Sequence, residues 1–141
     1  AVISECARFK YELISEDFED RGIRKILNFG HTLGHAIEKA SKYEVSHGMA
    51  VVKGMALMFR ISAGEGWCDE SIEEAFLALI DEYDYDASVD CGVDELIEYV
   101  KADKKRSGDY IDIVIPCKMN ECKIKRLLVT ELASLIERYL R

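Results

Sequence analysis

The sequence predicts a mainly α-helical domain, a multihelical bundle with a small β-hairpin near its carboxyl terminus. Three observations support this fold class. Segment 47–63 is apolar nearly all round, as expected for a helix at the centre of a bundle. Two short runs, 110–115 and 121–127, alternate like the strands of a hairpin. The 141 residues suit one domain and leave little room for a second.

Helical spacing of apolar residues predicts most of the other elements. A first helix is expected at residues 1–14, and an acidic connection, 15–22, follows it and closes on a glycine. A long helix is expected at 24–43, where Gly30 and Gly34 interrupt the apolar stripe. Glycine costs about 1 kcal/mol against alanine inside a helix, so we expect another element to approach these two closely. The remaining helices are expected from about 70 to 83, at 94–105 and at 130–140.

Composition narrows the possible function classes. Lys and Arg number 19 against 27 Asp and Glu, and the formal net charge of −8 argues against nucleic-acid binding. No apolar run approaches the ~20 residues of a membrane span, and the first residues do not resemble a signal peptide. The five cysteines are scattered without a CxxC pair, which indicates reduced thiols and a cytoplasmic protein. The chain does not begin with Met, and we interpret it as a sequence that starts partway along a longer protein.

All three histidines of the chain fall within seventeen positions. His31 and His35 are four apart and share a face of a helix, while His47 begins the next helix and can fold back beside them. Two imidazoles with a third group can hold a catalytic zinc ion. Spacing alone favours His31 and His35 as the ligand pair. Histidines that are satisfied in the core or in helix caps are the alternative interpretation.

Other polar residues accompany the histidines. Arg24 lies one helical turn before Asn28, and Asn28 lies one turn before His31. One helix face would therefore carry a cation, an amide and two imidazoles. Such a face suits an anionic, hydroxyl-rich ligand better than a dry core. Lys104 and Lys105 belong to a second basic cluster, which otherwise indicates a solvated helix end. Lys10 is isolated, and single lysines are mostly solvated.

Several separated stretches resemble the signature of the 3-dehydroquinate synthases. Residues 24–38 read RKILNFGHTLGHAIE, and residues 47–55 continue the family pattern as HGMAVVKGM. Segment 103–108, before the expected hairpin, is similar to the closing segment of that family, and the spacing of polar residues over 10–24 also fits. The resemblance covers nearly the whole chain, from about Ser4 to the end.

The resemblance implies a two-domain enzyme of which residues 1–141 form the helical half, with part of the metal and substrate site. The absent amino-terminal half is an α/β domain that binds NAD+, and this chain has no Gly-rich phosphate loop of its own. The implied reaction is a carbon–oxygen lyase step that converts 3-deoxy-arabino-heptulosonate 7-phosphate to 3-dehydroquinate and phosphate. It belongs to the shikimate pathway, which leads to chorismate and the aromatic amino acids. The chain alone is expected to be inactive.

The resemblance also implies roles for particular residues. His31 and His47 are implied as two of three ligands of Zn2+, for which Co2+ could substitute, and a glutamate of the absent half is the third. His35 is implied to contact the substrate phosphate and to transfer a proton. Asp20 stands at the position of a proton acceptor that is usually glutamate. The residues implied to bind substrate are Lys10, Arg24, Asn28, His31, His35, His47 and one of Lys104 and Lys105.

Three positions depart from the family pattern. Asp20 is one methylene shorter than glutamate, Met49 stands where glutamate is frequent, and Lys53 occupies a usually apolar or small position. Lys53 therefore needs an acidic partner or a route to solvent. A related sugar-phosphate cyclase and a non-catalytic helical module that binds metal or packs are the alternatives. His35 favours the synthase, because some related cyclases replace this second histidine. Besides the absent domain, a homodimer is a further expected partner, since family members often dimerise.

Overall fold

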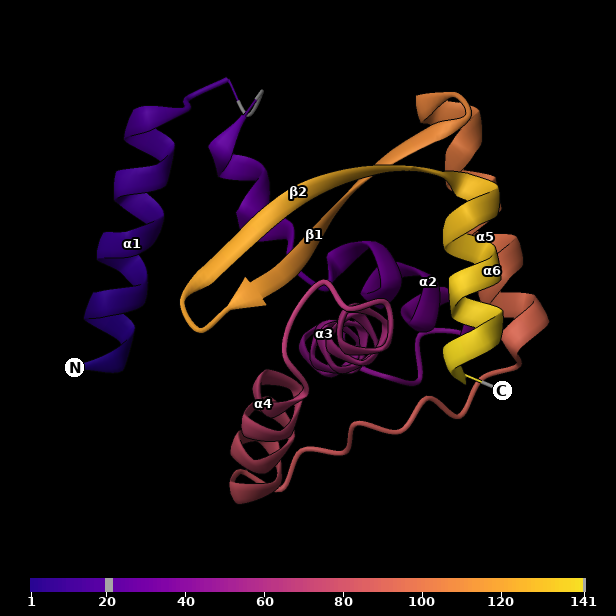
Figure 1. The fold of residues 1–141 in the computed structure, drawn as a ribbon, viewed down its shortest axis with the longest axis horizontal. Coiled ribbons are helices and arrows are strands. Elements are labelled where there is room, and N and C mark those ends of the chain that lie inside the picture. The colour runs from indigo at the N-terminus through magenta and orange to yellow at the C-terminus, as the bar shows by residue number, and fades with distance from the viewer. Residues whose placement is uncertain (20–21, 141) are drawn as a thin grey trace.

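The chain folds into six α-helices, one 3-10 helix and one β-hairpin in the computed structural model, which describes residues 1–19 and 22–140 (Figure 1). For residues 103–107 only the backbone is described. The elements in chain order are α1 (Val2–Glu16), η1 (Ile23–Asn28), α2 (His31–Ala40), α3 (His47–Gly64), α4 (Glu70–Glu82), α5 (Val93–Ser107), β1 (Tyr110–Lys118), β2 (Glu121–Leu128) and α6 (Val129–Leu140). This architecture confirms the predicted mainly α class with a hairpin near the carboxyl terminus.

Helix α3 occupies the centre of the molecule. It packs against α2, α4, α6 and strand β1, and the hairpin lies across it (Figure 1). Contacts on every side explain why the sequence of α3 is apolar nearly all round. Helix α5 joins the same core by packing against both α2 and α6. The most deeply buried side chains include Leu33, Ile37, Ile61, Leu96, Ile113, Leu132 and Ile136.

The hairpin is antiparallel and has the predicted position. Tyr110 lies opposite Leu128 at its open end, and Lys118 lies opposite Glu121 beside the turn. Asn120 takes up a positive φ of 61° in the turn, a conformation that asparagine tolerates well. The strands place Ile113 and its neighbours in the core against α3.

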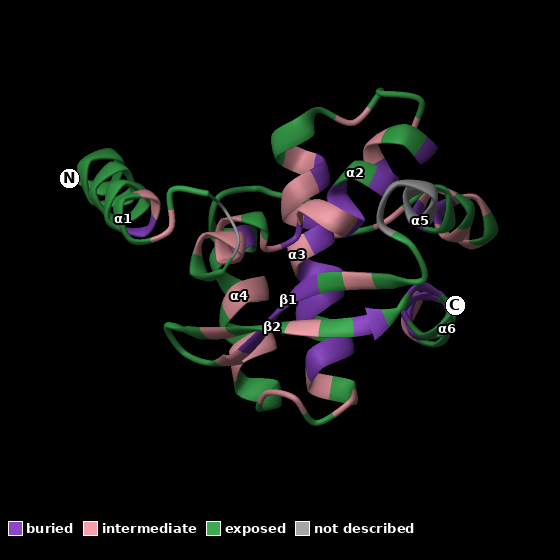
Figure 2. Cartoon of the chain, turned by 90° about the horizontal axis from the view of Figure 1, so that it is seen from above, coloured by how far each residue is buried: buried purple, intermediate pink, exposed green. Residues whose placement is uncertain are grey.

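Helix α1 stands at the margin of the molecule. It packs against η1, and Figures 1 and 2 both show it set apart from the other helices. Figure 2 shows that it is largely exposed. Only Leu13 among its described side chains is buried, while Val2, Ile3 and Tyr11 face solvent. Among the described residues, no helix is both long and apolar enough to cross a membrane.

The predicted continuous helix over 24–43 is wrong, because the chain breaks in front of the histidines. The 3-10 helix η1 ends at Asn28, and Gly30 then adopts a left-handed conformation with φ 77° before α2 begins. A right-handed helix cannot pass through such a residue. Arg24 and Asn28 therefore do not continue the helix face of the histidines, and the predicted single stripe does not exist.

Glycines allow α2 and α3 to meet backbone against backbone. A Cβ atom built on Gly34 would lie 3.0 Å from the carbonyl oxygen of Ala50, and one built on Gly54 would lie 2.6 Å from the amide nitrogen of Gly34. At Gly30, a Cβ would lie 2.8 Å from the carbonyl oxygen of Val51. The close approach predicted at Gly30 and Gly34 is confirmed, and Gly54 is its counterpart on α3.

The acidic partner that Lys53 requires comes from the connection between α4 and α5. Lys53 is only 5% exposed, and its ammonium group donates to the carboxylate of Asp86 at 2.7 Å and to the carbonyl oxygen of Ser88. Ser88 also donates its backbone N–H to Asp86 at 2.8 Å. Above all, the hydrogen bond from Lys53 holds the pKa of Asp86 well below its usual range. The pair ties the connection to the central helix.

We expect Gly54→Ala to destabilise the fold by about 3 kcal/mol, because the methyl group would press against the backbone of α2. Gly48→Ala is the matched control on the same helix, since nothing lies within 4 Å of a Cβ at that position. The control should be neutral or slightly stabilising. Urea unfolding followed by circular dichroism measures both. Equal stability of the two variants would contradict the close backbone contact.

We expect Asp86→Asn to destabilise the chain near neutral pH and to reduce its sensitivity to acid. The pKa of Asp86 is lowered in the folded state, so its contribution is present above about pH 4 and is lost as the pH falls below that value. Thermal unfolding between about pH 6 and 3 measures the difference from the wild type. Asp81→Asn, on an exposed carboxylate at the end of α4, is the control. A wild-type acid profile for Asp86→Asn would show that the Lys53 contact is not formed.

Candidate functional site

Three imidazole rings meet where α2 and α3 begin. The ring centres of His31 and His35 are 5.7 Å apart, and His47 lies 5.6 Å from each of them. The structure therefore brings together all three histidines as the sequence predicts. The triangle they form is nearly regular and is partly open to solvent.

The turn between α2 and α3 returns His47 to the other two histidines. Lys42 and Tyr43 have positive φ angles of 53° and 64°, and they reverse the chain after α2. The backbone N–H of Tyr43 donates to the carbonyl oxygen of Glu38 at 2.8 Å and closes the reversal. The glycine contact between the helices then keeps the first residue of α3 close to the side chains of α2.

Two of the three rings have a fixed orientation. Nδ1 of His31 lies 3.3 Å from the carbonyl oxygen of Phe29, and Nδ1 of His47 lies 3.1 Å from a carboxylate oxygen of Glu38. Both partners can only accept, so each Nδ1 donates its hydrogen, and in the neutral form of each ring Nε2 keeps a free lone pair. Histidines that ligate metals are commonly held in this way, by a carbonyl or carboxylate on the other nitrogen.

The carbonyl partner of His31 is itself held in place. The ring of Phe29 packs edge-on against Phe59 of α3, with centroids 5.2 Å apart. One turn earlier, Lys25 of η1 forms an ion pair with Asp112 of β1 at 2.8 Å. The segment before α2 is thus attached both to the central helix and to the hairpin.

His35 differs from the other two histidines. No hydrogen bond of its ring is found within the described part of the chain. Its pKa is lowered, first by partial burial of the ring and then by the neighbouring imidazoles of His31 and His47, while Glu38 opposes the shift and Lys39 adds to it. His35 is therefore neutral near pH 7 and can accept a proton from a bound molecule.

The donor set fits a metal ion at His31 and His47. Two imidazoles bound to one ion, with metal–nitrogen distances near 2.1 Å, have ring centres roughly 5 Å apart, and all three pairs of rings in the cluster are close to this separation. Nitrogen donors of this kind suit zinc or cobalt. Among the described side chains, which leave out those of residues 103–107, no group of three or more His, Cys, Asp or Glu is placed to hold a metal. The hydrogen bonds on Nδ1, and not the distances between the rings, distinguish His31 and His47 as the pair that resembles metal-ligating histidines.

The predicted substrate residues before α2 are less closely assembled. Arg24 donates from its guanidinium group to the carbonyl oxygen of Phe18 at 3.0 Å, and its backbone N–H donates to Asp17 at 3.2 Å. Asn28 is exposed at the end of η1. Lys10 lies on α1, which Figures 1 and 2 show well away from α2.

Three predicted residues fall wholly or partly outside the described part of the chain. Asp20 lies outside the described residues. Lys104 and Lys105 lie on the last turn of α5, where the backbone alone is described. Because α5 packs against α2, the fold carries these two positions on a helix next to the histidines.

Glu38 is a residue of the cluster that was not predicted from the sequence. It lies three residues after His35 and seven after His31, so helical spacing places all three on one side of α2. That spacing could have identified it as a partner for a histidine. The carbonyl of Phe29 had no such signal, since its role depends on the break at Gly30.

Comparison with known proteins points to one family. A profile described as "3-dehydroquinate synthase C-terminal" matches residues 1–106. The 3-dehydroquinate synthase of Alkaliphilus metalliredigens is 33% identical over 141 residues, covering 99% of this chain and 40% of that protein. Those of Dehalococcoides mccartyi strain CBDB1 and Thermococcus kodakarensis are each 36% identical, over 96% and 89% of this chain and 38% and 36% of theirs. The chain thus spans about two fifths of the length of these relatives.

Solved structures share the fold. A structure of 2-deoxy-scyllo-inosose synthase complexed with carbaglucose-6-phosphate, NAD+ and Co2+ superposes with a TM-score of 0.80 at 21% identity, covering 98% of this chain and 40% of that one. A second structure of 2-deoxy-scyllo-inosose synthase gives a TM-score of 0.78 at 22% identity, covering 95% and 39%. At these identities the similarity supports the fold and leaves the substrate open.

We expect the chain to bind Co2+ weakly, and we expect Glu38→Gln to lower that affinity about tenfold, because His47 would lose the carboxylate that orients it. Titration followed by the visible absorption of cobalt measures the affinity. Glu44→Gln, at an exposed glutamate of the turn before α3, is the control. His31→Ala and His47→Ala should abolish binding, and His35→Ala should retain it. Loss of binding in His35→Ala alone would overturn the choice of ligand pair.

Proposed function

The chain belongs to the 3-dehydroquinate synthase family as its carboxy-terminal domain, and on that premise we propose that it is the metal- and substrate-binding half of such an enzyme. The complete enzyme would convert 3-deoxy-arabino-heptulosonate 7-phosphate to 3-dehydroquinate and phosphate in the cytoplasm. This lyase step serves the shikimate pathway and, through chorismate, the aromatic amino acids. The other half would be an amino-terminal domain that holds NAD+.

The observation that carries this proposal is the pair of oriented imidazoles. The Nε2 atoms of His31 and His47 are free, and the Nδ1 atoms of both rings are held by acceptors. We propose that these two nitrogens bind Zn2+, or Co2+ in its place, and that a glutamate of the amino-terminal half completes the site. The chemistry such an ion supplies, when bound, is Lewis-acid polarisation of the hydroxyl that is oxidised. A metal ion bound only by these two histidines, without the third protein ligand, would be weakly bound.

His35 is suited to the proton transfer that accompanies phosphate loss. It is neutral near pH 7, and no described hydrogen bond occupies its ring. A neutral imidazole can take up a proton from the substrate and can also donate to a phosphate oxygen once it is protonated. We therefore propose that His35 contacts the substrate phosphate. Asp20 is proposed as a second proton acceptor. Because its side chain is one methylene shorter than that of glutamate, the substrate would have to lie closer to this position than a glutamate would require.

The cations and amide around the histidines are proposed to bind the anionic, hydroxyl-rich substrate. Arg24 can hold a carboxylate with the guanidinium N–H groups that its contact with Phe18 does not use. Asn28, at the exposed end of η1, is proposed to contact the ring hydroxyls. Lys10 and one of Lys104 and Lys105 are proposed to reach the substrate from α1 and α5, which would converge on it from two sides.

The test is a phosphate-release assay on the full-length coding product that contains this chain. We expect turnover with NAD+ and Zn2+. His31→Ala should lose both bound metal and turnover, whereas His35→Ala should keep the metal and slow turnover about a hundredfold, as expected for removal of a proton-transfer group. The 141-residue chain alone should show none, because it lacks the hydride acceptor site.

Three results would contradict the proposal. Turnover by the 141-residue chain alone would show that the amino-terminal half is not required. Metal binding without phosphate release by the full-length product would favour the non-catalytic module. Release of phosphate from a different sugar phosphate, with the heptulosonate phosphate left unchanged, would favour a related cyclase.

A further inference from the structure

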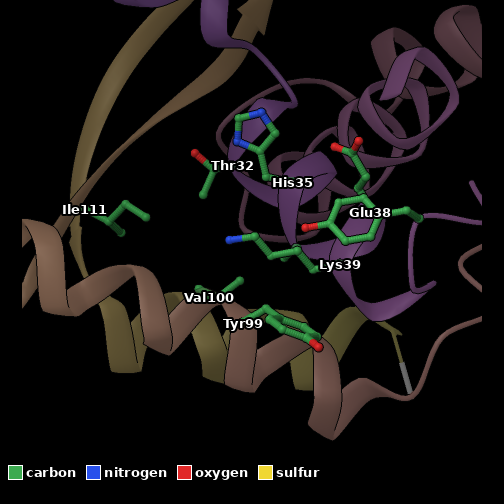
Figure 3. Close-up of a pocket in the computed structure, with 9 residues that line it drawn as sticks. Thr32, His35, Glu38, Lys39, Tyr99, Val100 and Ile111 are labelled. Carbon is green, nitrogen blue, oxygen red and sulfur yellow. The ribbon is translucent and has the colours of Figure 1, made fainter. Parts of the chain in front are cut away.

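Two cavities lie away from the histidine cluster, along the connection between α4 and α5. The cavity in Figure 3, beside His35, belongs to the candidate site and is not one of them. The larger of the two has a volume of about 470 Å³, and residues 90–92 of the connection form part of its lining. The smaller has a volume of about 390 Å³ and is lined in part by residues 87–89. One short stretch of backbone therefore borders both cavities.

This stretch is an extended segment, 86–92, which we call the strap. The backbone N–H of Tyr85 still donates to the carbonyl oxygen of Ile80 at 2.9 Å, and the strap then runs to the start of α5 without helix or strand (Figure 1). Ala87, Val89 and Cys91 are partly buried, while the residues between them are exposed. This alternation indicates that every second side chain of the strap faces the protein.

Lys53 of α3 holds the strap in place. Its buried ammonium group donates to Asp86 at 2.7 Å and to the carbonyl oxygen of Ser88. Ser88 donates its backbone N–H and its hydroxyl to the same carboxylate, at 2.8 and 2.7 Å. Within the described residues, no other hydrogen bond or ion pair joins 86–91 to the rest of the molecule. The polar attachment of the strap thus depends on one side chain.

The two partners of this attachment differ in their exposure to water. Lys53 is 5% exposed, whereas the side chain of Asp86 is 61% exposed. An apolar side chain of similar length at position 53 would fill the same space and would leave Asp86 in water, at little cost to the fold. Position 53 is also one of those that depart from the family pattern, so the attachment is a feature of this chain.

We propose that the strap opens by itself, without unfolding of the core, and that Lys53 controls how often it opens. In the closed state Cys91 lines the larger cavity and packs against the core. In the open state both cavities lose one of their walls, and the thiol of Cys91 becomes accessible to electrophiles. The turn between α2 and α3 stays closed, because Tyr43 and Glu38 hold it with their own hydrogen bond. This inference does not depend on the proposed function.

The first experiment measures how fast iodoacetamide alkylates each thiol of the folded 141-residue chain, followed by mass spectrometry of its peptides. We expect Lys53→Met to speed alkylation of Cys91 about tenfold, because the strap opens more often. The rates at Cys6 and Cys122 should not change. Cys6 is exposed on α1 and reports the reagent, whereas Cys122 is partly buried in the hairpin and reports opening elsewhere. Lys101→Met, at an exposed lysine of α5, is the matched control.

The direct electrostatic effect of this substitution has the opposite sign. Burial raises the pKa of the Cys91 thiol, and the nearby ammonium group of Lys53 opposes part of that rise. Removal of the ammonium group therefore raises the pKa further and lowers the fraction of thiolate, which is the form that reacts. If the strap stayed closed, alkylation would become slower. Faster alkylation therefore reports opening of the strap.

The second experiment follows amide hydrogen exchange by NMR and global stability by urea unfolding. In Lys53→Met, the amide of Ser88 should exchange about tenfold faster, while the amides of Tyr43 and of α3 and the urea midpoint stay as in the wild type. Asp86→Asn should also speed exchange at Ser88, but it should lower the urea midpoint because Lys53 remains buried without its charged partner.

Two results would overturn the inference. Alkylation of Cys91 at the wild-type rate or slower in Lys53→Met would show that Lys53 does not control the strap. Equal acceleration at Cys91 and Cys122 would show that the strap opens only together with the core. If Lys53→Met does not fold, Asp86→Asn allows the same comparison between Cys91 and Cys122, since it weakens the attachment from the side of the strap.

Discussion

The direct backbone contact between α2 and α3 is the constraint on which the rest of the structure depends. Gly34 and Gly54 face each other with no side chain between them, and Gly30 turns the chain into α2 at the same crossing. Helices that carry ordinary side chains at their contact stand about 8–10 Å apart. A larger separation here would move the start of α3, and with it His47, away from the two histidines of α2. The three imidazoles can meet because these positions lack a Cβ atom.

The three histidines of the cluster differ in what they can do because the hydrogen-bond partners of their Nδ1 atoms differ. His31 and His47 are oriented on Nδ1 by a carbonyl and a carboxylate, an arrangement that is common among metal-ligating histidines. His35 has no such partner in the described part of the chain, and its surroundings keep it neutral. A neutral, unrestrained imidazole beside two oriented ones suits proton transfer next to a metal. The division follows from the supporting groups, Phe29 and Glu38, more than from the histidines.

The features that depend on the local spacing of residues were predicted correctly from the sequence. The central helix, the hairpin and the grouping of the three histidines depend on periodicity and short range, and all three are confirmed. Apolar spacing could not reveal that Gly30 is left-handed, so the helix predicted over 24–43 was wrong, together with the stripe that linked Arg24 to the histidines. The need of Lys53 for an acidic partner was predictable, but its partner, Asp86, lies 33 residues away and depends on the tertiary fold. Spacing alone preferred His31 and His35 as ligands and carries no information on hydrogen-bond partners, so the choice of ligand pair stays a prediction.

The central claim is that this crossing presents His31 and His47, and not His35, to a metal. Anomalous diffraction from crystals of the chain grown with Zn2+ tests it most directly. The account predicts one ion about 2.1 Å from Nε2 of both His31 and His47, with Glu38 still bound to Nδ1 of His47 and with His35 outside the coordination sphere. An ion shared by His31 and His35, or one bound through Nδ1 of either predicted ligand, would contradict it.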